Sequence, residues 1–183
     1  MNKTIARFLR LSTLEGERTV AYVRLGLCVL VLLERVILLD SLSLLRQGNP
    51  GEAVAVSGLV VGALFALWVL SRVDNAAPER LPELSALMDV VLVSLVVLPQ
   101  VLWPPTDWEG LLSVPAWSFW VLAVVGAGFR LSHLAVVCAA VASAVALLGF
   151  VSLDQALNGA VGDPPLESLV LAFIVLCGAA LLS

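Results

Sequence analysis

Residues 131–153 read LSHLAVVCAAVASAVALLGFVSL, a run that carries no charge apart from one neutral histidine. A helix needs about 20 apolar residues to cross the ~30 Å hydrocarbon core of a bilayer, because each residue adds ~1.5 Å. This run is long enough, and it lacks the polar alternation of a strand in a membrane barrel. It therefore predicts a transmembrane α-helix.

The same criterion predicts further spanning helices on both sides of this run. Three other stretches, 53–71, 90–106 and 110–129, are free of charged residues, whereas 20–39 is equally long but holds Arg24, Glu34 and Arg35. The predicted helices cover residues 20–39, 53–71, 84–103, 111–129, 131–150 and 166–183. We therefore expect an all-α membrane protein, with a cytoplasmic lead-in at 1–18 and a six-helix transmembrane bundle at 19–183.

The composition of the whole chain agrees with a membrane protein. Of its 183 residues, 61% are hydrophobic and 13% are charged, whereas soluble domains are about half apolar and a quarter charged. This composition excludes a soluble globular domain and a disordered chain. The formal charge of −4, without a basic stripe, argues against a nucleic-acid partner. The partner that the composition implies is the lipid bilayer.

Lysine and arginine predict the orientation of the bundle, because these residues accumulate in cytoplasmic loops. On one side of the predicted bundle, the loops contain a single lysine or arginine, Arg46. The loops and the lead-in of the opposite side hold Lys3, Arg7, Arg10, Arg18, Arg72, Arg80 and Arg130. Both termini are therefore predicted to be cytoplasmic, in a multi-pass membrane protein. The apolar face of Ile5, Phe8 and Leu9 fits either a lead-in helix on the inner leaflet or a solvated segment.

Two charged residues inside the predicted spans are expected to pair. A charge at the centre of a spanning helix costs roughly 2.5–3.5 kcal/mol on insertion scales. Arg24 and Asp89 each lie about five residues inside helices that run outward, so both side chains sit at the same depth. We predict a structural ion pair between them. The alternative is that Arg24 snorkels to the inner surface and Asp89 faces water.

A second polar group is predicted near the outer surface. Glu34, Arg35 and Gln100 reach a similar outer depth. Tryptophans favour membrane interfaces, and four of them cluster near the outer ends of the third and fourth predicted helices: Trp103, Trp108, Trp117 and Trp120. Of these, Trp103, Trp117 and Trp120 are assigned to the same group. The group is a candidate site for a stimulus, such as a small hydrophobic or protein ligand. The alternative is an ion pair that snorkels to the headgroups.

Small residues at four-residue spacing mark places where helices approach closely. They are Gly58 and Gly62 in one predicted helix, and Ala135, Ala139 and Ser143 in another. They fit either a dimer face or contacts inside the bundle. The sequence contains no motif for catalysis, a metal ion or a cofactor, so any enzymatic activity is expected from a region outside this chain.

Three short motifs stand in the lead-in and near the starts of the first and third predicted helices: FLRL at residues 8–11, AYVRL at 21–25 and LSALMD at 84–89. Together they resemble the membrane input domains of bacterial sensor proteins. Such domains precede the catalytic core in sensor histidine kinases of the type that controls pilus genes and in some class III adenylyl or guanylyl cyclases. The resemblance implies a dimeric sensor and anchor in a bacterial inner membrane, which continues beyond Ser183 into a cytoplasmic kinase or cyclase.

Two other functions fit a six-helix chain of this size. One is an accessory subunit of a larger membrane complex, and the other is the substrate-binding subunit of an uptake transporter. The transporter subunit needs a small-residue face on the first helix, where this chain has Arg24, Glu34 and Arg35 instead. An accessory subunit requires no particular pattern.

Overall fold

The computed structural model describes residues 3–37, 48–75, 80–104, 110–111, 117–130 and 132–159, with scattered residues between 170 and 180. All regular structure in this part of the chain is helical. The long helices are α1 (Lys3–Ile37), α3 (Pro50–Asn75), α4 (Leu81–Leu102), α5 (Ser118–Gly128) and α6 (His133–Asn158). The predicted all-α class is thereby confirmed.

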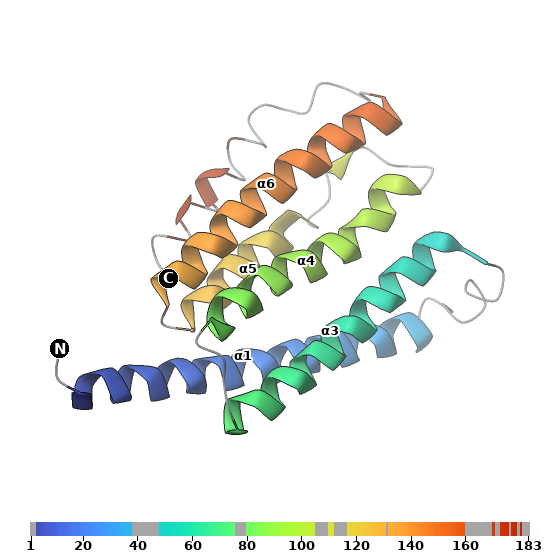
Figure 1. Ribbon diagram of the computed structural model, residues 1–183. Helices are drawn as coiled ribbons and strands as arrows, with labels where there is room; N and C mark the ends of the chain where they lie inside the picture. The colour runs from blue at the N-terminus through green and yellow to red at the C-terminus, as the bar shows by residue number, and fades with distance from the viewer. Residues whose placement is uncertain are drawn as a thin grey trace.

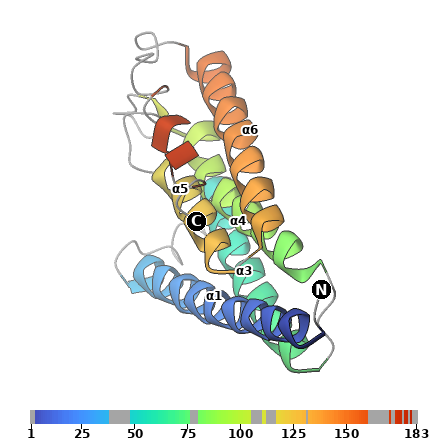
Figure 2. The same ribbon diagram turned by 90° about the vertical axis from the view of Figure 1, so that its left-hand side faces the viewer.

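The helices form two packed groups, α1 with α3 and α4 with α5 and α6, which are joined by the contact between α3 and α4. Figures 1 and 2 show α1 crossing the lower side of the molecule, with α3 against it and α4, α5 and α6 grouped above. α3 packs on both α1 and α4, and α6 packs on both α4 and α5. α1 itself makes few contacts with α4. The position of α1 relative to the upper group therefore depends on a small number of residues.

Three of these helices, α3, α4 and α6, are long and apolar enough to cross a membrane. α5 is a shorter apolar helix, and the apolar part of α1 is interrupted by Arg24, Glu34 and Arg35. The chain thus has the helices of a membrane protein. Only scattered residues of the predicted sixth span at 166–183 are described, so the count of six stays a prediction.

The first helix is longer than the sequence predicted. A lead-in at 1–18 and a separate helix at 20–39 were expected, but α1 runs without a break from Lys3 to Ile37. This segment contains no proline, and its isolated glycines each cost only about 1 kcal/mol relative to alanine. Because helix propagation is cooperative, the apolar helix extends through the polar lead-in.

The later boundaries also differ. α6 continues to Asn158 rather than ending at residue 150, and it stops at Gly159, whose φ of +61° favours glycine. α5 begins at Ser118 rather than at 111, and residues 112–116 lie outside the described part of the chain. The extension of α6 brings Asp154, which lies between the predicted spans 131–150 and 166–183, into the helix.

The core lies among α4, α5 and α6 and is centred on Trp120. This side chain is fully buried, and its indole Nε1 donates to Ser94 Oγ at 3.3 Å. The Ser143 hydroxyl donates to the Trp120 carbonyl at 3.5 Å. A buried tryptophan needs such a partner for its N–H group. Trp120 was expected in an outer aromatic belt, but the structure places it in the core.

The small-residue positions are contacts within the bundle. A Cβ atom on Gly58 would lie 3.1 Å from Leu95 of α4, and one on Gly62 would lie 2.9 Å from Cys28 Sγ of α1. The stripe on α6, formed by Ala135, Ala139 and Ser143, is fully buried. Of the two expected uses, the structure shows close approach between helices of the same chain.

Candidate functional site

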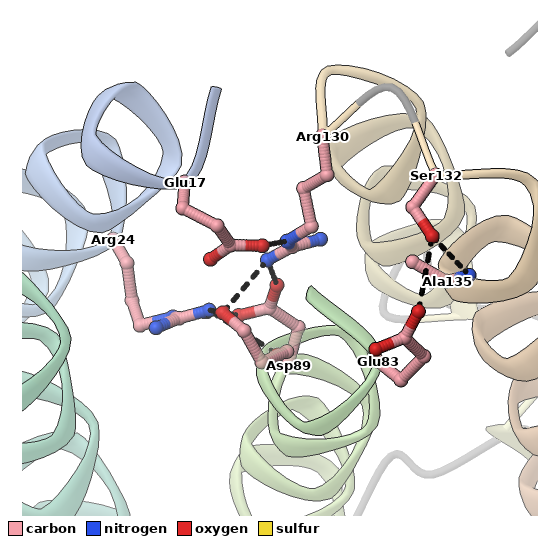
Figure 3. A network of polar contacts seen from close by, with 8 residues as sticks. Glu17, Arg24, Glu83, Asp89, Arg130, Ser132 and Ala135 are labelled. Atoms are coloured by element: carbon pink, nitrogen blue, oxygen red, sulfur yellow. Dashed lines mark hydrogen bonds and ion pairs between the residues drawn. The ribbon is translucent and has the colours of Figure 1, made fainter. Parts of the chain in front are cut away.

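Four charged side chains meet where α1, α4 and the turn between α5 and α6 come together (Figure 3). They are Glu17 and Arg24 from α1, Asp89 from α4 and Arg130 from the turn. We call this group the inner charge network, because it lies at the end of the bundle that is predicted to be cytoplasmic.

Arg24 is held by α4 on one side and by an aromatic ring on the other. Its guanidinium is 2.6 Å from Asp89 Oδ1, and its Nη2 donates to Ser85 Oγ at 3.0 Å. The guanidinium also lies 5.0 Å from the centre of the Phe65 ring, a cation–π distance. Arg24 is therefore buried inside the protein instead of snorkelling to the surface.

Arg130 links the two carboxylates of the network. Its Nε lies 2.7 Å from Glu17 Oε1, and its Nη2 donates to Asp89 Oδ2. The side chains of Arg130 and Glu17 are both fully buried. Charges of alternating sign thus follow one another from Glu17 through Arg130 and Asp89 to Arg24, and their formal sum is zero.

Burial makes this network sensitive to the loss of any one member. Removing one partner of a buried ion pair is strongly destabilising, because it leaves an uncompensated charge, whereas the intact pair adds little net stability. Burial raises the pKa of Glu17 above its ordinary value, and the Arg130 charge opposes that shift. The network therefore specifies how the elements fit together more than it strengthens the fold.

The backbone of α1 also touches the turn directly. A Cβ atom on Gly16 would lie 2.3 Å from the carbonyl oxygen of Phe129, so only glycine fits at this point. Beside this contact, Ser132 caps α6 by accepting from the Ala135 N–H, and it donates to Glu83 of α4 at 3.1 Å. The turn is thus held from both α1 and α4.

The outer polar group predicted from the sequence is not brought together. Arg35 Nη1 binds Glu52 Oε2 of α3 at 2.8 Å, and Glu34 is exposed. Among the described residues, Gln100 makes no hydrogen bond with either of them. Glu52 lies in the first turn of α3, the helix that packs along α1, so Arg35 is directed to α3 rather than to α4.

The three tryptophans of the predicted stimulus site also separate. Trp103 is exposed and lies near Gly51 of α3, whereas Trp117 is half-buried against the core. Trp120 is in the core itself. These side chains therefore belong to different environments and do not line one site.

A second polar contact closes the opposite end of the bundle. Asp154 Oδ2 accepts from the Leu111 N–H at 2.8 Å. Asn158 Nδ2 donates to Asp154 Oδ1 at 2.6 Å and to the Val101 carbonyl at 3.1 Å. These bonds join α4, α6 and the segment that leads to α5.

Replacing Asp154 with leucine is expected to lower the free energy of unfolding by about 1–3 kcal/mol. The substitution leaves the buried Leu111 N–H without its acceptor, and that desolvation penalty is the cost. Thermal unfolding in detergent measures it. Gln155→Leu, one residue away and exposed, is the control, and equal losses in both variants would contradict the assignment.

Glu17 and Arg130 are the members of the network that the sequence analysis missed. Both were assigned to segments outside the predicted spans, where charges are ordinary. A signal for Glu17 was present, because it precedes Arg24 by seven residues and so lies on the same face of one helix. For Arg130, the segment between two apolar runs is short, which holds the side chain close to the helix ends.

No protein-family model matches this chain, and neither does any curated protein or solved structure. In the part of the chain that the structure describes, no group of three or more His, Cys, Asp or Glu side chains is placed to hold a metal ion. The functional interpretation therefore rests on the inner charge network.

Proposed function

We propose that this chain is the membrane-embedded input and anchoring module of a bacterial signal-transduction protein. Its partner would be a cytoplasmic histidine kinase or nucleotide cyclase, held at the inner membrane as a dimer. The observation that carries the proposal is the inner charge network. It joins α1, α4 and the α5–α6 turn at the end of the bundle predicted to face the cytoplasm.

The chemistry of the network suits a part that transmits a change of helix position. Ion pairs are directional and strongly distance-dependent in a medium of low dielectric constant, so a small helix shift changes their energy. Packed helices change arrangement by small translations and rotations of this kind. A sensor needs such a junction between its membrane helices and its cytoplasmic partner.

The uptake-transporter alternative is less compatible with α1. Its exposed side is formed mainly by large apolar side chains, among them Val23, Leu27 and Leu30. A close helix partner in the membrane favours small residues instead. These large side chains are suited to contact with lipid.

The reading frame beyond the codon for Ser183 provides the first test. A frame that continues into a kinase or cyclase core supports the proposal. A stop codon directly after Ser183 favours an accessory or transporter subunit and contradicts it.

A functional test uses the full-length protein in vesicles. We expect Asp89→Asn to change autophosphorylation or cyclic nucleotide formation several-fold, because it removes the carboxylate shared by both arginines. Glu15→Gln replaces an exposed carboxylate of α1 and should leave the activity unchanged. Equal activity of the wild type and the Asp89→Asn variant would count against the proposal.

A further inference from the structure

We infer that the inner charge network is a separable latch, from which the inner half of α1 can leave while the other helices stay assembled. The first argument is the small number of contacts. α1 packs along α3, and its inner half meets α4 and the α5–α6 turn through the network, the close approach at Gly16 and a small apolar cluster. This cluster joins Ala21 to Val69 of α3 and Leu81 of α4. Opening the latch therefore breaks one localised set of interactions.

The second argument is the distribution of charge between the two sides. Glu17 and Arg24 belong to α1 and lie two helical turns apart on one face. Asp89 and Arg130 belong to the other side and bind each other directly. Each side carries one negative and one positive charge, so separation leaves no net charge behind on either of them.

The third argument is that the closed latch does not satisfy all of its polar atoms. Arg24 Nη1 and Arg130 Nη1 are buried and have no hydrogen-bond partner among the described residues. Water reaches these groups when α1 moves away, and hydration offsets part of the lost ion-pair energy. The closed arrangement is thus weaker than its short ion pairs indicate.

The remaining contacts of α1 define where it pivots. Cys28 lies against Gly62, and Arg35 pairs with Glu52. Both contacts attach α1 to α3 beyond Arg24, and neither involves the described residues of the α5–α6 turn. The inner end of α1 can therefore swing while its outer part stays on α3. This inference stands on contacts alone and does not require the proposed signalling role.

The test measures distances between spin labels in protein reconstituted into vesicles of phosphatidylethanolamine and phosphatidylglycerol. Cys28, Cys138 and Cys177 are first changed to alanine. Labels at the exposed positions Leu11 of α1 and Leu134 of α6 then report the latch. Labels at Leu84 of α4 and Leu134 report whether the remaining helices stay together.

The informative variant is the double substitution Glu17→Leu and Arg24→Leu, which removes both charges of α1 together. We expect longer and broader distances between positions 11 and 134, with the distance between 84 and 134 unchanged. Each single substitution leaves one charge of the network uncompensated, so its yield of folded protein should fall several-fold below that of the double variant. Glu15→Gln is the control and should resemble the wild type in both distances and yield.

Two results would overturn the latch. One is an unchanged distance between positions 11 and 134 in the double variant. The other concerns the yield of folded protein relative to the wild type. If the relative yield of the double variant is as low as the product of the relative yields of the two single variants, α1 and the remaining helices fold only as one unit.

Discussion

Asp89→Leu lowers the free energy of unfolding by about 3–5 kcal/mol, the expected cost of removing one partner from a buried ion pair. Asp89 is the carboxylate that both Arg24 and Arg130 bind. Without it, two guanidinium groups remain close together with Glu17 as the only carboxylate in the network. Equilibrium unfolding in detergent, followed by circular dichroism, measures the loss.

The control for this prediction is the neighbouring substitution Met88→Leu, which changes no charge and is expected to cost less than about 1.5 kcal/mol. A double-mutant cycle then isolates the pair. Arg24→Leu combined with Asp89→Leu should cost less than the sum of the two single losses, because the coupling between residues in contact is lost only once. Strictly additive losses would show that the two charges do not interact.

Gly16→Val is expected to have the second large effect, a loss of about 1–3 kcal/mol or more from overpacking. The new Cβ atom would lie 2.3 Å from the Phe129 carbonyl oxygen. This neighbour is a backbone atom of the turn that carries Arg130, so it cannot rotate aside as a side chain does. Either α1 or the turn must move, and the contact between Glu17 and Arg130 lengthens with it.

A second glycine of α1 provides the matched control. Gly26 has no atom within 4 Å of an added Cβ. Gly26→Ala should therefore be neutral or stabilising by up to about 1 kcal/mol, the difference in helix propensity. Gly16→Ala should destabilise despite the same gain in propensity. Equal effects of the two alanine substitutions would exclude a steric role for Gly16.

These experiments separate the three parts of the interpretation. The stability measurements test the contacts of the inner charge network, and the spin-label distances test whether those contacts form a latch. Effector activity tests the signalling role. A network that is essential for stability but does not alter activity would be a structural pin of a membrane subunit.

Much of the architecture follows from local composition. The runs that form α3, α4 and α6 are long and apolar and contain few charged residues. In an apolar environment such a run forms a helix, because a helix satisfies its own backbone hydrogen bonds. The sequence could therefore identify α3 and α4 within four residues at each end, whereas α6 extends eight residues beyond its predicted end. It also paired Arg24 with Asp89 from depth alone, and the structure places the two side chains in contact.

The outer site shows where this reasoning stops. Depth along a helix follows from residue number, but the neighbour that a side chain meets depends on how the helices rotate and pack. Arg35 lies at the predicted depth, yet it binds Glu52 because α1 packs on α3. Trp120 was assigned to the interface by its position, whereas helix rotation turns its ring into the core.

The sequence by itself determined the helical class and the need to compensate the charges in the first helix, because both follow from the cost of polar groups in an apolar environment. Only the tertiary structure decided that Glu17 and Arg130 complete the compensation. Their pairing depends on the close approach of α1 to the α5–α6 turn at Gly16. That approach is set by packing among distant segments, and no local pattern encodes it.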